Sequence, residues 1–283
     1  MARTKKKKSE MTDEEVGVVL PFNRLVSAMI TIIVTGLVPD FFLVIVFFWL
    51  LTLTPPSFLF LITWVFAAPL LFWLVYFLYL GTTILVTHGF LAYYDTQSKA
   101  QPEVLKRQFK DTNHPDYKKL HYYHMRGAII KYSLWITQKC PFPSLVTRVL
   151  NFYGHNTIGK HVLYDNIYPG LEFTDIKDDA IMEVGSSLST HVVESLYGNL
   201  IIAKVLVDTR GVVGINSIVG PGIIVEKDFQ VGDNAMTFQN WPLKRGDDGR
   251  VFFNGSPAKL ANFENMFADG PLKQQYLETV RKS

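Results

Sequence analysis

A six-residue rhythm of aliphatic residues runs through the segment from Ile201 to Thr237. Its members recur at every sixth position: Ile201, Val207, Val213, Val219, Val225 and Val231. Helices repeat every 3.6 residues and strands every two, so neither has this period. Three short strands of six residues close one triangular coil, and the period therefore predicts a parallel β-helix in which each of these aliphatic residues points inward. Small residues four positions later suit the coil corners: Gly211, Ser217 and Ala235.

The same rhythm begins earlier, near Phe152, and is interrupted once. Ile158 and Ile176 are one full coil apart, and Met182 and Leu188 continue the step. The distance from Leu188 to Ile201 is thirteen residues, one more than two steps. We therefore expect a register slip after His191, with the segment 194–200 leaving the coil as a loop. The predicted β-helix covers residues 152–260, and a C-terminal helix is expected over 261–283.

The segment 25–94 is strongly apolar and predicts transmembrane helices with two crossings. Its first part, 25–54, is interrupted only by the pair Pro39-Asp40, so it forms either one kinked span or two helices broken there, the first re-entrant or interfacial. A carboxylate at the centre of a bilayer costs about 2.5–3.5 kcal/mol, so Asp40 marks either a structural break or a proton site. From Phe58 to Tyr94 there is no Asp, Glu, Lys or Arg before the chain turns polar. About 20 apolar residues suffice to span a bilayer.

Basic residues flank the apolar region on both sides. The tail over 1–24 begins with Arg3 and the run Lys5 to Lys8, and further lysines follow after Tyr94. Because positive flanks stay on the cytoplasmic side, we expect an integral protein of the cell membrane with both termini in the cytoplasm. The segment 95–151 mixes aromatic residues with cations, which predicts amphipathic helices in the plane of the membrane interface.

Composition narrows the chemistry. The formal net charge of +3 gives no reason to expect a nucleic-acid partner, since the basic residues gather beside the apolar segments. The single cysteine, Cys140, excludes an internal disulfide and an all-cysteine metal site. No cleavable signal peptide is expected, because the first apolar run begins late and another apolar run follows it.

His191 is the candidate catalytic residue. It lies beside a predicted corner, immediately before the predicted loop, where an exposed imidazole acts as a general base on an amine or hydroxyl. Glu194 could orient it or bind an amine, and Glu183 is another candidate carboxylate. The structural alternative is a corner histidine bonded to the backbone.

A metal site is a further alternative, because His155 and His161 together with His191 would place three histidines on adjacent coils. This set resembles the γ-class carbonic anhydrases, which also use a β-helix and bind zinc through three histidines across a subunit interface. The order of the close pair and the distant histidine is the reverse of that class. The acidic and amide partners of its site are not evident either, and we expect no bound metal.

The segment from His191 to Val231, with the sequence GSPAK (255–259), resembles the left-handed β-helix (hexapeptide-repeat) acyltransferases. GSPAK is similar to the Gly-x-Pro-Ala-Lys/Arg ending of that superfamily, which lies near the pantetheine arm of coenzyme A. Over residues 115–260 the stretches HYYHMRGAIIKYSLW, LNFYGHNTIGKHV and FTDIKDDAIMEVGSSLSTHVVES resemble the membrane-anchored C-terminal region of poly-amino-acid synthetases such as ε-poly-lysine synthetase. This chain has one β-helix unit and neither an adenylation nor a carrier domain.

The resemblance implies a homotrimeric membrane-anchored acyltransferase. The donor would be acyl-CoA or a phosphopantetheine thioester on a carrier protein, bound as a co-substrate with no tightly held cofactor. His191 with Glu194 would be catalytic, and the donor would meet residues at the corner and in the terminal motif: Asn216, Ser217, Gly255, Pro257 and Lys259. The alternative from a different class is a non-enzymatic trimeric membrane scaffold with an inert β-helix.

Overall fold

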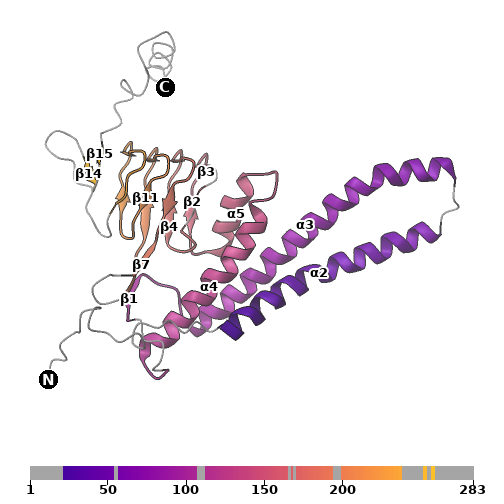
Figure 1. Cartoon of the computed structure of the whole chain (residues 1–283), viewed down its shortest axis with the longest axis horizontal. Coiled ribbons are helices and arrows are strands. Elements are labelled where there is room, and N and C mark those ends of the chain that lie inside the picture. Colours follow the sequence, from indigo (N-terminus) through magenta and orange to yellow (C-terminus); the bar gives the residue numbers. More distant parts are fainter. Residues whose placement is uncertain are drawn as a thin grey trace, which may run out of the picture. The chain divides into compact units, whose positions relative to one another are not determined.

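The computed structural model describes residues 22–53, 57–106, 112–164, 167, 170–193, 199–237, 251–253 and 256–258. The chain divides into two compact units. The helical unit contains the helices α2 to α5, and the coil unit contains the strands that follow them in sequence (Figure 1). The predicted tail up to residue 21 and the predicted C-terminal helix over 261–283 lie outside the described residues.

The helical unit is built on two long apolar helices, α2 (Phe22–Thr52) and α3 (Phe58–Gln97), which pack against each other. Both are long and apolar enough to cross a membrane, by length and composition. α2 continues through Pro39 and Asp40 without a break, so of the two expected arrangements the single helix is observed. Proline removes one hydrogen bond from a helix interior. The helix nevertheless continues on both sides of Pro39, and it packs against α3.

Two shorter helices complete this unit, α4 (Pro115–Thr137) and α5 (Ser144–Tyr153). α4 begins where His114 caps it: the imidazole accepts a hydrogen bond from the backbone N–H of Asp116, and Pro115 occupies the first helical turn. A proline is favourable there because its missing N–H would have no helical partner. Helices therefore occupy 115–137 and 144–153 of the segment 95–151, and their predicted place in the membrane interface stays a prediction.

The coil unit is a stack of short parallel strands in the residue order that the six-residue rhythm predicts (Figure 1). β2 (Thr157–Ile158), β4 (Thr174–Ile176), β9 (Val205–Val207) and β12 (Ile224–Val225) form one sheet. β3 (Leu163–Tyr164), β5 (Ile181–Met182), β10 (Val212–Val213) and β13 (Gln230–Val231) form a second, while β6 (Ser187–Leu188) and β11 (Ile218–Val219) form a third. The parallel β-helix is thus confirmed.

Inward-facing residues stack in columns along the coil. Ile158 pairs with Ile176, and Val207 with Val225, each a step of 18 residues. Ile176 and Met182 and the valines of the rhythm from Val207 to Val231 are fully buried. Burying each such side chain contributes about 1.5–3 kcal/mol, so the columns are the main source of stability in this unit.

The interruption of the rhythm is a β-hairpin, and it changes the role predicted for Ile201. Ile176 pairs with Val207, a step of 31 residues (207 − 176), which is thirteen more than one coil. The extra residues form β7 (His191–Val193) and β8 (Leu200–Ile202), which pair antiparallel, with β8 also beside β1 (Glu103–Leu105). Ile201 therefore belongs to the hairpin. The prediction that it begins the inward column is wrong, because the coil resumes only at Val205.

One corner of the coil carries a column of charged residues in the left-handed backbone region. His161, Asp179, Arg210 and Asp228 have φ between 55° and 60° and follow one another by single coils. Arg210 donates to Asp228 through Nη2 at 2.8 Å, and His161 Nδ1 lies 3.2 Å from Asp179 Oδ1. Exposed pairs of this kind contribute little to stability. Each pair joins neighbouring coils at the same corner.

Candidate functional site

His191 lies at the start of the hairpin. It is the first residue of β7, and its backbone pairs with that of Ile202. The hairpin is closed at its base, where Ala203 N–H donates to Thr190 O at 2.9 Å. The imidazole of His191 is exposed. Its proposed partner Glu194 lies outside the described residues.

The residues predicted to contact the donor face different environments. Asn216 is exposed at a corner with φ 53°, and its N–H donates to Val184 O. Ser217 is fully buried, and its hydroxyl donates to Gly232 O at 2.6 Å. The side chain of Asn216 therefore lies at the surface, with Oδ1 against Gly185, whereas the hydroxyl of Ser217 links two coils.

The terminal motif is described only in part. Pro257 lies in β15 (Ser256–Ala258), which pairs antiparallel with β14 (Val251–Phe253), with Pro257 opposite Phe252. Gly255 and Lys259 lie outside the described residues. The motif thus includes one strand of an antiparallel pair. This pair forms its own sheet, separate from the parallel sheets of the coil.

A buried histidine–carboxylate pair joins the first two coils. His155 Nδ1 lies 2.9 Å from Glu172 Oε1, and their side chains are only 11% and 3% exposed. The backbone ties the same coils together, since Phe173 N–H donates to His155 O at 2.8 Å. Phe173 has φ 64°, an uncommon value for a bulky aromatic residue. The backbone at Phe173 therefore holds Glu172 against His155 at a conformational cost.

Glu172 was missed as a site residue from the sequence. The signal that could have found it is its distance of 17 positions from His155, one short of a full coil, which places the two side chains on neighbouring coils. His161 and Asp179, 18 positions apart, form a similar pair at another corner, but these side chains are 80% and 52% exposed. Periodicity predicts both pairs as neighbours, and only the structure distinguishes the buried one.

Replacing His155 with Ala should destabilise the chain by about 1–3 kcal/mol, because it removes the polar group 2.9 Å from Oε1 of the buried Glu172. The matched variant His161→Ala removes an exposed partner and should cost at most about 1 kcal/mol. Chemical unfolding followed by circular dichroism measures both. Equal effects of the two substitutions would contradict the structural importance of the buried pair.

Two other carboxylates in the coil unit have perturbed pKa values of opposite sign. Burial of Asp175 acts to raise its pKa, but hydrogen bonds from Lys204 at 2.7 Å and Lys177 at 3.1 Å outweigh burial and lower it. Burial raises the pKa of Glu183, and the nearby charge of Asp233 raises it further. The ionised form of Asp175 is thus stabilised by the fold, whereas the ionised form of Glu183 is destabilised by it.

These shifts predict opposite effects of neutral substitutions at neutral pH. Asp175→Asn should lower the melting temperature, because the ionised carboxylate is more stable in the folded chain, beside Lys204 and Lys177, than in the unfolded chain. This contribution is lost in the wild type as the pH falls through the lowered pKa. Glu183→Gln should raise the melting temperature at neutral pH, and its advantage should disappear on acidification. Melting curves of the three proteins from about pH 3 to about pH 8 test both signs, and a shared sign would contradict this assignment.

Two of the three histidines considered as metal ligands are paired with different carboxylates, His155 with Glu172 and His161 with Asp179. Among the described residues, no three His, Cys, Asp or Glu side chains form a group that could hold a metal ion.

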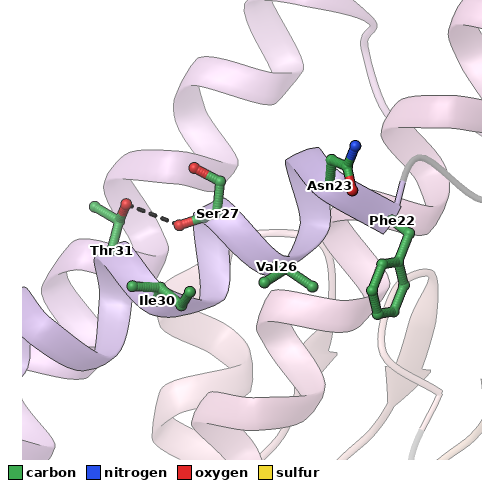
Figure 2. Close-up of a pocket in the computed structure, with 6 residues that line it drawn as sticks. All are labelled: Phe22, Asn23, Val26, Ser27, Ile30 and Thr31. Atoms are coloured by element: carbon green, nitrogen blue, oxygen red, sulfur yellow. Dashed lines mark hydrogen bonds between the residues drawn. The ribbon is translucent and has the colours of Figure 1, made fainter.

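A shallow groove lies on the surface of α2, with a volume of about 330 Å³. Figure 2 shows its lining, in which Thr31 Oγ1 donates to Ser27 O at 2.9 Å. The lining residues come from the first turns of this one helix: Phe22, Asn23, Val26, Ser27, Ile30 and Thr31. No acid, base or nucleophilic thiol lines the groove, so it offers none of the groups expected of a catalytic site.

Comparison with known proteins gives similarity to solved structures only. No family model matches the chain, and no curated protein matches it. Serine acetyltransferase isoform 3 of Entamoeba histolytica, in complex with cysteine, is 12% identical, with 71% of this chain and 67% of that chain covered and a TM-score of 0.28.

Two further structures are similar at the same level. Serine acetyltransferase of Neisseria gonorrhoeae is 10% identical over 71% of this chain and 75% of its own, with a TM-score of 0.32. A maltose O-acetyltransferase of Clostridium difficile 630 is 13% identical over 56% of this chain and 79% of its own, with a TM-score of 0.25. Likeness at this level assigns the chain to no family.

Proposed function

We propose that this chain is a membrane-anchored, homotrimeric acyltransferase that transfers an acyl group from a coenzyme A or carrier-bound pantetheine thioester to an amine or hydroxyl. The observation that carries the proposal is the hairpin β7–β8, which interrupts the parallel coil and has the exposed His191 as its first residue. Loops held by a rigid scaffold are the usual places for binding and catalysis. The sequence resemblance around His191 and GSPAK supports the same activity.

In the proposed reaction His191 is the general base. Its neutral imidazole takes the proton from the acceptor N–H or O–H as the acceptor attacks the thioester carbonyl carbon. The resulting oxyanion would be stabilised by backbone N–H groups. The C–S bond then breaks, and the leaving thiolate receives the proton from the imidazolium. Glu194 assists His191, and Asn216 with the terminal motif contacts the donor.

The helical unit supplies the proposed anchor. α2 and α3 are uncharged over most of their length and expose large apolar side chains along their surfaces, among them Phe41, Trp49 and Phe66. Exposed apolar surface of this extent is costly in water and favourable in lipid. The basic flanks place both termini in the cytoplasm of the proposed arrangement, with the coil unit on the same side.

The experiment uses the full chain in nanodiscs, with acetyl-CoA as donor and a panel of primary amines and hydroxyl compounds as acceptors. Release of free thiol reports transfer, and the melting temperature with and without coenzyme A reports donor binding. We expect both acceptor-dependent thiol release and a rise in melting temperature. Absence of both would favour the inert scaffold.

A further inference from the structure

Asp40 is a buried carboxyl group in the middle of α2, far from either helix end. The residue is only 5% exposed. Neither of its two carboxyl oxygens has a hydrogen-bond partner among the described residues. Because α2 is continuous at this point, Asp40 cannot be explained as the polar end of a broken helix.

The face of α2 that carries Asp40 is its packing face. The buried residues of this helix recur every four positions: Ala28, Ile32, Gly36 and Asp40. Gly36 lies against α3, because a Cβ atom at Gly36 would be 2.7 Å from Cε2 of Tyr79 and 2.9 Å from Oγ1 of Thr83. Asp40 lies one turn beyond Gly36 on the same face, and therefore between helices, away from the exposed surface of α2.

The packed helices contribute hydroxyl groups near this face. Tyr79 of α3 lies opposite Gly36, and its hydroxyl is 2.6 Å from that of Tyr132 in α4. Tyr76 donates to Ile136 O at 3.2 Å. No side chain of the described residues that could carry a positive charge forms an ion pair with Asp40.

The charged groups of the helical unit lie elsewhere. Arg24 is sixteen positions before Asp40 on the same helix, about 24 Å along its axis. On the packed helices, Asp95 of α3 pairs with Arg126 of α4 at 3.8 Å, and Lys131 of α4 is exposed. Among the described residues, therefore, the carboxyl group of Asp40 has neither a hydrogen-bond partner nor an ion pair.

An ionised carboxylate in such a place loses its hydration without gaining a partner, which makes the charged form very unfavourable. A protonated carboxyl group carries no charge, so its burial costs far less. A bound metal ion would need several oxygen ligands, and no such cluster exists among the described residues. We propose that Asp40 is a proton-binding site, at which the helical unit holds one exchangeable proton between its helices.

The direct test is the infrared difference spectrum between the wild-type chain and Asp40→Asn in nanodiscs. We expect the C=O stretching band of a protonated carboxyl group in the wild type at about pH 7, absent from the variant. The band should shift in D₂O, because the proton exchanges, and should weaken as the pH is raised. Asp95→Asn, which removes a carboxylate paired with Arg126, should leave the band unchanged.

Three results would overturn the proposal. The first is the absence of a protonated band from the wild type at about pH 7. The second is a band that survives in Asp40→Asn. The third is a band that responds to neither D₂O nor pH, since such a proton is not exchangeable.

A second measurement is independent of spectroscopy. The melting temperature of the wild type relative to Asp40→Asn should fall as the pH rises from about 5 to about 9, because the unfolded chain releases this proton readily and the folded chain does not. The difference in melting temperature between the two proteins should be the same in Na⁺ and in K⁺. If one of these ions stabilised the wild type but not Asp40→Asn, the site would bind that metal cation and the proposal would be overturned.

Discussion

Replacing Val213 with Asp is expected to unfold the coil unit. Val213 is fully buried in the column where it pairs with Met182 on one side and Val231 on the other. An aspartate there would be an unpaired charge among aliphatic side chains, at a cost of several kcal/mol. Stabilities of natural domains are about 5–15 kcal/mol, so most of the stability would be lost.

The matched control for this experiment is Ile215→Asp in the same coil. Ile215 is 44% exposed, and its side chain is outside the column. The substitution should change stability by at most about 0.5 kcal/mol. Circular dichroism and size-exclusion chromatography of both variants measure the difference. A folded Val213→Asp protein, or equal damage from Ile215→Asp, would contradict the assignment of these two residues to the inside and the outside.

Replacing His191 with Ala is expected to reduce the proposed acyl transfer by about 10²–10⁴-fold, the contribution of a positioned general base. The fold should not change, because the imidazole is exposed and the pairing of His191 with Ile202 uses only backbone groups. The wild-type rate should rise with pH near the usual imidazole titration, at about pH 6.5. His191→Gln should lose this dependence.

The control for His191 is another exposed histidine. His161 lies at a coil corner beside Asp179, and His161→Ala should leave the transfer rate unchanged. Thiol release from acetyl-CoA measures all three variants under the same conditions. Full activity of His191→Ala would remove this residue as the base. The absence of turnover in every protein, including the wild type, would contradict the acyltransferase itself.

The two units differ in how they accommodate ionisable side chains. The coil unit buries aliphatic columns and forms ion pairs between neighbouring strands or coils, such as Asp175 with Lys204 and Arg210 with Asp228. The helical unit buries Asp40 without a partner among the described residues. Proteins keep unpaired buried ionisable groups mainly where these groups have a function, which is the general reason for testing Asp40.

Periodicity was sufficient to predict most of the backbone. A six-residue step can be satisfied only by a coil of short strands, so the columns through Ile176 and Met182 follow from the sequence. The interruption near His191 also follows, because the distance from Leu188 to Ile201 is one residue more than two six-residue steps. The two long apolar helices follow from the length of the uncharged segments. Each of these inferences depends on local pattern alone.

Other features depended on contacts between distant residues. The thirteen residues added to this coil could form a loop or a hairpin. In the structure β7 pairs with β8, so they form a hairpin, and Ile201 belongs to it and not to the inward column. The pair His155 and Glu172 is buried, whereas the pair His161 and Asp179 is exposed. The spacing of these residues along the chain is nearly the same, so it does not distinguish the two pairs. Likewise, only the structure shows that α2 continues through Pro39 and packs against α3.

The sequence by itself therefore determined the repeating architecture, the apolar helices and the candidate His191, because these are encoded in the spacing of residues along the chain. Only the tertiary structure decided which polar groups are buried, since burial depends on neighbours that are distant in sequence. Asp40 is the clearest example. The sequence around Asp40 is compatible with a helix end or with a helix interior. The structure places Asp40 in the interior of α2 on its buried face, where its carboxyl group has no partner among the described residues.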